Sequence, residues 1–125
     1  MLKYIGVLLL GLVVGGVCGV LWGQRGVNAP KFETTFQAVL LDSGQVYYAK
    51  VEGLGTAFPI LRDVYYVQSA TDPQTKQVTN VLIRRGNEWH GPQMTVINAR
   101  HLVMIEPIGP NSKVAQLIAE KEQEK

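Results

Sequence analysis

The chain begins with a long run of hydrophobic positions. From Ile5 to Leu21 there is no charged side chain, and Cys18 is the only side chain with any polarity. In a helix this run extends over about 26 Å, close to the hydrocarbon thickness of a bilayer. Tyr4 and Trp22 stand at its two ends, where aromatic anchors occupy the membrane interface. The pattern predicts a transmembrane helix over residues 1–24.

A cleaved signal peptide is the alternative, because a charged start before an apolar segment is also typical of secretory signals. The run is longer than a usual signal core, and no small-x-small cleavage site precedes the polar chain. We therefore favour an uncleaved signal anchor. A short, positively charged amino end usually stays in the cytoplasm, so we expect the amino end inside and the following domain outside the cytoplasm.

Glycine recurs at every fourth position of this run, at Gly11, Gly15, Gly19 and Gly23. This spacing aligns the four glycines on one helix face, where a second helix can approach closely. The pattern predicts helix packing through a glycine zipper. A glycine stripe that faces lipid without a partner is the alternative interpretation.

The pattern changes after a polar linker over residues 25–35, which includes a glycine and a proline. Short apolar and β-branched runs then alternate with turns, among them the "DSG" turn with Gly44 free to take positive φ and a polar loop over residues 69–77. The predicted strands are 36–41, 45–51, 58–67, 78–85, 94–98 and 101–107. Five or six short, regularly spaced strands favour a small β-barrel or sandwich over residues 36–107.

Alternation along these strands also predicts which side chains point inward. A register shift of one residue would exchange the two faces. The expected core consists of Val39, Leu41, Val46, Tyr48, Leu61, Val64, Val81, Ile83, Val96, Leu102 and Ile105.

The last segment, residues 108–125, has the pattern of a short helix followed by a polar tail. Asn111 or Ser112 can cap its amino end, and Val114, Leu117 and Ile118 share one face. The predicted fold is mainly β: an N-terminal transmembrane helix, a small five- to six-stranded barrel and a short C-terminal helix.

Two stretches resemble the signatures of Sm-like domains. "AVLLDSGQVYYAKV" resembles the first signature, and "VINARHLVMIEP" resembles the second. The chain also resembles short, uncharacterised bacterial single-pass membrane proteins with a "GQVYF"-like second strand. These resemblances cover residues 36–107, and they imply an Sm-like or SH3-like barrel that associates edge to edge, anchored in the bacterial cytoplasmic membrane.

Two departures from the Sm-like pattern affect the RNA pocket that the resemblance would imply. Phe58 stands where RNA-holding members of that family place an asparagine, and Ala99 replaces the glycine of the second signature. The resemblance therefore implies the fold and edge-to-edge assembly, and it does not imply RNA binding.

Charge bears on the same question, because phosphate neutralisation supplies most nucleic-acid affinity. Between residues 34 and 107, six positive side chains balance six negative ones. Arg84 and Arg85, near Trp89 and His90, are the candidate nucleic-acid residues. The alternative interpretation is two exposed arginines at a strand end, with Trp89 covering a barrel mouth. We do not expect nucleic acid to be the main partner.

The residues that catalysis and metal binding require are sparse. Ser43, Ser69 and Ser112 fall in predicted turns or caps, where serine has an ordinary structural use. His90 and His101 are the only histidines, too few for a zinc site without cysteine ligands. We expect no enzyme activity, no metal and no cofactor.

Two tyrosine pairs suggest an interaction surface. Adjacent strand residues face opposite ways, so one ring of each pair points outward. Tyrosine and tryptophan are enriched at protein interfaces, although outward rings can also shield strand edges or face the C-terminal helix. The interface candidates are Tyr47, Tyr48, Tyr65, Tyr66 and Trp89.

The sequence thus predicts a membrane-anchored, non-catalytic scaffold or accessory protein that mediates protein–protein association. Its expected partners are the lipid bilayer and either another protein or a second copy of the chain. The alternative is a membrane-tethered Sm-like module that binds nucleic acid.

Overall fold

The computed structural model describes residues 29–124 of the 125-residue chain. The expected membrane span and its four glycines, Gly11, Gly15, Gly19 and Gly23, lie outside the described residues. Across residues 29–124, no helix combines the length and the apolar character needed to cross a membrane.

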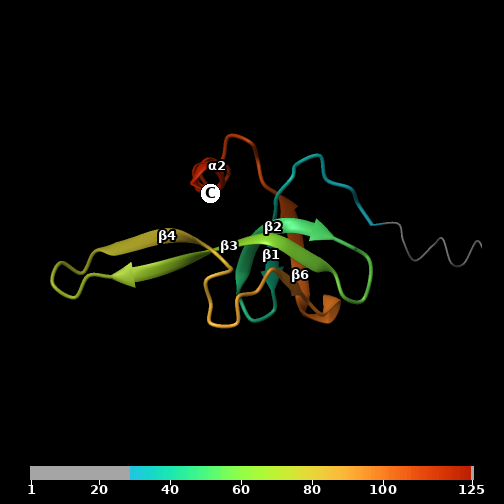
Figure 1. The fold of residues 1–125 in the computed structure, drawn as a ribbon, viewed down its shortest axis with the longest axis horizontal. Coiled ribbons are helices and arrows are strands. Elements are labelled where there is room, and N and C mark those ends of the chain that lie inside the picture. The colour runs from blue at the N-terminus through green and yellow to red at the C-terminus, as the bar shows by residue number, and fades with distance from the viewer. Residues whose placement is uncertain (1–28, 125) are drawn as a thin grey trace, which may run out of the picture. The chain divides into compact units, whose positions relative to one another are not determined.

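The described part is a β domain with one α-helix, as the sequence predicts (Figure 1). Six strands form one antiparallel sheet, and a 3-10 helix, η1, separates the last two. The elements are β1 Gln37–Leu41, β2 Val46–Glu52, β3 Ile60–Thr71, β4 Val78–Arg84, β5 Met94–Val96, η1 Ala99–His101, β6 Leu102–Pro107 and α2 Lys113–Gln123.

Strand β3 is the longest and has three neighbours. The strand order is β4-β3-β2-β1-β6, and β5 also pairs with β3. The first residues of β3 lie between β2 and β5, whereas Tyr65–Thr71 pair with β4. The β3–β4 hairpin extends well beyond the rest of the sheet (Figure 1).

The hairpin is longer than the sequence predicts, because strand pairing continues to Thr71 and Val78. The expected loop of 69–77 was therefore too long. A compact turn closes the hairpin: Asp72 Oδ1 accepts hydrogen bonds from the backbone N–H groups of Gln74, at 2.8 Å, and Thr75, at 3.3 Å. Because the Asp72 side chain accepts these two hydrogen bonds, the turn is short and the two strands continue further toward the tip.

A bulge divides β3 into two parts. Tyr48 pairs with Tyr65 and Lys50 pairs with Arg62, so two steps along β2 match three along β3. The extra residue lies next to Asp63, whose φ of 49° is in the left-handed region. Because the bulge inserts one residue, Leu61 and Val64 both face the same apolar cluster although they are three positions apart.

The core consists of two apolar clusters. The first contains Val39, Ala49, Leu61, Val64 and Ile97. The second contains Tyr65, Leu82, Ile108 and Ile118 and lies where α2 packs against the sheet. Val39, Leu61 and Val64 are buried as predicted, and Leu41, Leu102 and Ile105 pack against the first cluster.

Two predicted core positions were wrong by one residue. Val81 in β4 is 46% exposed while its neighbour Leu82 is 4% exposed, and Val96 in β5 is 51% exposed while Ile97 is 8% exposed. Adjacent strand residues face opposite sides, so a shift of one residue exchanges them. In β4 the buried side is the one that faces the second cluster, where Leu82 packs with Ile118 of α2.

Helix α2 begins at the position that the sequence indicates. The Ser112 hydroxyl accepts a hydrogen bond from the backbone N–H of Ala115 at 3.1 Å, which makes Ser112 the N-cap. Ile118 is buried in the second cluster, and Val114 and Leu117 pack beside it. The apolar face predicted for this helix therefore covers the sheet.

Candidate functional site

The tyrosines proposed as an interface divide between the two faces of the sheet. Tyr47 packs against the first cluster, Tyr48 packs against the second, and Tyr65 is fully buried within the second. Tyr66 follows Tyr65 and therefore points to the opposite face, where it is partly exposed. The structure brings no single tyrosine surface together, and Tyr65 is part of the core.

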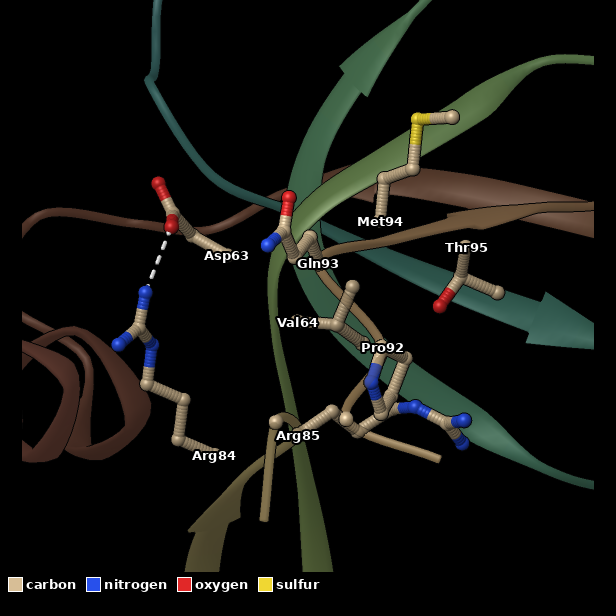
Figure 2. A pocket seen from close by; sticks show the side chains of 10 residues that line it. Asp63, Val64, Arg84, Arg85, Pro92, Gln93, Met94 and Thr95 are labelled. Atoms are coloured by element: carbon tan, nitrogen blue, oxygen red, sulfur yellow. Dashed lines mark hydrogen bonds and ion pairs between the residues drawn. The ribbon is translucent and has the colours of Figure 1, made fainter. Parts of the chain in front are cut away.

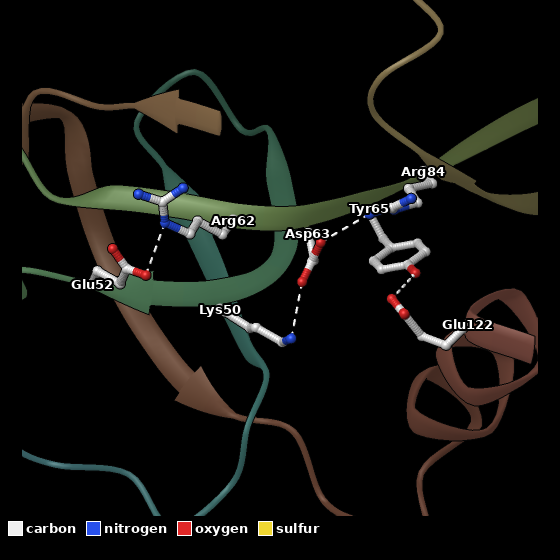
Figure 3. A network of polar contacts seen from close by, with 7 residues as sticks. All are labelled: Lys50, Glu52, Arg62, Asp63, Tyr65, Arg84 and Glu122. Atoms are coloured by element: carbon white, nitrogen blue, oxygen red, sulfur yellow. Dashed lines mark hydrogen bonds and ion pairs between the residues drawn. The ribbon is translucent and has the colours of Figure 1, made fainter. Parts of the chain in front are cut away.

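Tyr65 instead belongs to a polar network that joins the sheet to α2 (Figure 3). Its hydroxyl donates a hydrogen bond to Glu122 Oε1 at 2.5 Å. Burial, reinforced by this contact with a carboxylate, raises the pKa of the Tyr65 hydroxyl well above its ordinary value of 10.0. The Phe36 ring contacts Tyr65 edge to face, with 6.0 Å between the ring centroids. The segment that enters β1, the sheet and the last helix therefore meet at one tyrosine.

Asp63, at the bulge, holds two cations in the same network (Figure 3). Its carboxylate lies 2.9 Å from Lys50 Nζ and 2.8 Å from Arg84 Nη2. An aspartate tolerates positive φ better than most side chains, which suits it to this position. The bulge thus places one carboxylate where β2 and β4 can each supply a partner.

A cavity of about 370 Å³ lies beside Asp63 and Arg84 (Figure 2). The β3 bulge and the end of β4 form part of its wall, and the chain that returns toward β5 forms the rest. The lining residues are Asp63, Val64, Arg84, Arg85, Gly86, Gly91, Pro92, Gln93, Met94 and Thr95. Sequence reasoning pointed to the two arginines and missed the cavity, because no local pattern marks a wall built from three separate segments.

The two arginines point in different directions (Figure 2). Arg84 is held by Asp63, whereas Arg85 Nη1 donates a hydrogen bond to the Tyr47 hydroxyl at 3.3 Å. The Arg85 guanidinium carbon lies 5.6 Å from the centre of the Tyr47 ring. Within the described residues, the Nε–H groups of both arginines are buried and have no hydrogen-bond acceptor.

The loop after β4 is braced by Glu88. Its Oε2 accepts a hydrogen bond from the backbone N–H of Gly86 at 2.8 Å, and its carbonyl accepts one from Gly91, also at 2.8 Å. Glu88 Oε1 lies 3.9 Å from Arg85 Nε. The hydrogen bond from Gly86 lowers the pKa of the Glu88 carboxyl below its ordinary value of 4.5.

Trp89 lies within this braced loop, and its side chain is fully exposed. The expectation that it covers the mouth of a barrel was wrong. Gly86, with φ of 141°, and Gly91, with φ of 53°, take conformations that disfavour other residues and allow the tight loop. The loop thus presents an indole to solvent, while its two end glycines line the cavity.

A second, more apolar groove of about 670 Å³ lies between residues 33–36 and α2. Phe36, Ile108 and Ile118 supply apolar surface, while Lys50 and Glu122 place charges along it. This groove adjoins the second core cluster, to which these three apolar side chains belong or against which they pack.

Comparison of the chain with models of known protein families and with curated protein sequences found no match. Function is therefore inferred from the residues and their arrangement.

Proposed function

We propose that this chain is a membrane-anchored, non-catalytic scaffold or accessory protein that mediates protein–protein association. Residues 1–24 are the anchor in the bacterial cytoplasmic membrane, and Gly11, Gly15, Gly19 and Gly23 form its packing face. Residues 25–35 are the linker, and residues 36–107 and 108–125 form the head outside the cytoplasm.

The strand path supports an Sm-like or SH3-like barrel as the form of the head. Apart from the β3–β4 hairpin, the strands run β5-β3-β2-β1-β6, all antiparallel. Its two end strands, β5 and β6, are joined by the short helix η1. A small barrel of this kind exposes two end strands on which neighbours can pair.

The exposed apolar side chains on these end strands carry the proposal. Met94 and Val96 in β5 are 47% and 51% exposed, and Val103 and Met104 in β6 are 59% and 48% exposed. Within residues 29–124, β5 and β6 each pair with one strand only, so each has an edge available for a neighbour. Exposed apolar side chains beside free backbone donors and acceptors favour association.

Cross-linking of the full chain in native membranes tests the function. We expect a cross-linked species that contains a second protein or a second copy. Val103→Lys combined with Met104→Lys places charge on the β6 edge and should reduce that species about tenfold, whereas Gln116→Lys on the exposed side of α2 is the matched control. A monomer that never forms cross-links in membranes would contradict the proposal.

The glycine face is tested separately. Gly15→Leu adds bulk where two helices would approach closely, so we expect it to weaken association in detergent or bilayers. Val13→Leu changes a residue on the opposite side of the same helix and serves as the control. An oligomer size unchanged by Gly15→Leu would contradict the packing role.

A further inference from the structure

We infer that the outer edge of β4, in the projecting β3–β4 hairpin, pairs with the same edge of a second copy of this chain. The two strands run antiparallel about a two-fold axis at Asn80. This inference rests on the proposed function, because it names the partner of the head. The surface is separate from the end strands β5 and β6: it lies on the part of the hairpin that projects beyond the rest of the sheet (Figure 1).

The backbone of β4 has hydrogen-bonding groups that point away from the sheet. The backbone N–H of Arg85, the residue after β4, donates to the Val64 carbonyl at 2.8 Å. Bonded and non-bonded pairs alternate along an antiparallel ladder, so every second residue of β4 counted from Arg85 bonds to β3. The residues between them direct their N–H and C=O groups outward; they are Val78, Asn80, Leu82 and Arg84. Within residues 29–124, β4 pairs with β3 alone, so this edge has no strand partner.

The paired part of the hairpin lacks the residues that normally protect a sheet edge. Positions 66–71 and 78–83 contain no Asp, Glu, Lys, Arg or Pro. Natural edge strands are usually blunted by such residues. A short, uncharged segment that is rich in β-branched residues favours pairing with copies of itself. Two identical hairpins also align here without bringing like charges together, which favours a second copy as the partner.

The side chains of β4 complement one another when two copies pair about Asn80. In this register Val78 lies opposite Leu82 of the second copy, and Thr79 lies opposite Val81, so β-branched and aliphatic side chains meet across the seam. Val78 is 63% exposed, whereas Leu82 belongs to the second cluster, so pairing covers Val78 with apolar surface. Moving the axis by one residue to Val81 would place Asn80 opposite Leu82, a polar side chain against an apolar one.

The Asn80 side chain is oriented for a contact at the axis. The Ser69 hydroxyl donates a hydrogen bond to Asn80 Oδ1 at 2.6 Å, which directs Oδ1 toward β3 and Nδ2 toward the outer edge. Each Nδ2 can then donate to Oδ1 of the second copy, because an amide oxygen accepts two hydrogen bonds. An amide pair flanked by apolar pairs fixes the register, since any shift would separate the two amides.

The proposed membrane anchor makes a contact of this size sufficient. Pairing of two strands gives a small interface, whereas stable complexes in solution usually bury at least about 1,000 Å² in total. Two heads that hang from neighbouring anchors on one membrane meet at a high effective concentration. We therefore expect the pairing in bilayers, with the anchors present.

The test uses the purified full chain in phospholipid bilayers. Cys18, the only cysteine, is replaced by serine in every variant. Thr79→Cys combined with Val81→Cys places thiols opposite each other on both sides of the axis, in non-bonded pairs whose Cα atoms, about 4.5 Å apart, permit a disulfide. With diamide as the oxidant, we expect a disulfide-linked dimer on non-reducing gels. A chain that stays monomeric under these conditions would overturn the inference.

A second cysteine pair on β3 is the matched control. Gln68→Cys combined with Ala70→Cys has the same spacing on the same exposed face of the hairpin, because these residues pair with Val81 and Thr79. The control thiols lie one strand away from the seam, so we expect about tenfold less dimer than from the β4 pair. Equal yields from the two pairs would show random collision and would also overturn the inference.

Proline substitutions test the backbone pairing. Asn80→Pro removes an outward N–H and leaves the bonds to β3 in place, so it should reduce the dimer of the β4 cysteine pair about tenfold. Ser69→Pro removes the N–H on the opposite edge of the hairpin and breaks the same side-chain hydrogen bond, yet it should leave the dimer unchanged. A dimer that survives Asn80→Pro, or one that both prolines reduce equally, would contradict pairing through β4.

Native membranes separate this inference from the proposed function. If the natural chain cross-links to a partner there while the β4 cysteine pair gives no dimer in purified bilayers, the strand pairing is overturned and the association function remains. If the β4 cysteines in native membranes join the chain to a different protein, a strand of that protein replaces the second copy and the inference is overturned.

Discussion

The Tyr65 hydroxyl donates a hydrogen bond to Glu122 Oε1 at 2.5 Å and so joins the middle of β3 to the end of α2. The two residues are 57 positions apart in the chain, and the contact holds the helix over the second apolar cluster. The first consequence concerns stability. Tyr65→Phe keeps the ring and removes the hydrogen bond, so we expect the free energy of unfolding to fall by about 1 kcal/mol. Tyr66→Phe is the control, with a change below about 0.5 kcal/mol in denaturant titrations of the full chain.

The raised pKa of Tyr65 predicts a dependence on alkaline pH. The folded state keeps the Tyr65 proton above pH 10.0, where an unfolded tyrosine loses it, so the unfolded state binds fewer protons there. The stabilising contribution is complete below pH 10.0 and is lost as the pH rises above that value. We expect the free energy of unfolding to fall more steeply above pH 10 in the natural chain than in Tyr65→Phe. Parallel pH profiles for the two proteins would contradict this.

The positive φ of Asp63 predicts which substitutions at the bulge reduce stability more. Asp63→Asn tolerates the left-handed conformation and loses the charge pairing with Lys50 and Arg84, so we expect the free energy of unfolding to fall by about 1 kcal/mol. Asp63→Val adds the strain of a β-branched residue at positive φ, about 1–2 kcal/mol more. Thermal unfolding of both variants should show this order, and equal stability would indicate that the bulge relaxes.

The register of β4 predicts that alanine substitutions at Leu82 and Val81 reduce stability by very different amounts. Leu82 is buried in the second cluster, so Leu82→Ala should reduce stability by about 3 kcal/mol. Val81→Ala removes an exposed side chain and should stay within about 0.5 kcal/mol. The reverse order would mean that β4 pairs with β3 one residue away from the observed register.

The depressed pKa of Glu88 predicts that the Trp89 loop loosens in acid. The folded state favours the ionised carboxylate, so the hydrogen bond to Gly86 is fully stabilising above pH 4.5 and is lost as the pH falls below that value. The Gly86 amide signal in NMR spectra should move with this titration. Glu88→Gln should remove the pH dependence, and an amide that moves identically in both proteins would contradict the assignment.

Much of the fold follows from local sequence patterns. The strands lie close to the predicted ranges, Gly44 has a φ of 88° in the predicted turn, and Ser112 caps α2. Turn residues and N-caps act through their own backbone neighbours, so short stretches of sequence are enough to identify them.

The features that the sequence could not supply depend on contacts between distant segments of the chain. Nothing in the local sequence shows that Asp63 takes positive φ. Leu82 rather than Val81 is buried because its side of β4 faces the cluster that Ile118 of α2 completes, a contact between segments far apart in the sequence. The cavity beside Arg84 could not be predicted for the same reason, because the bulge builds one of its walls.

The outer part of the projecting β3–β4 hairpin is exposed on both faces, so its length can change without disturbing the two core clusters. Beyond Arg84 and Tyr65, paired positions such as Ser69 and Asn80 contact each other across the two strands. Removing two residues from each strand of the ribbon would shorten it and leave the faces of the remaining side chains as they are. Losing a single residue at Asp63 would instead exchange the two faces of β3 beyond that point and move Tyr65 out of the second cluster.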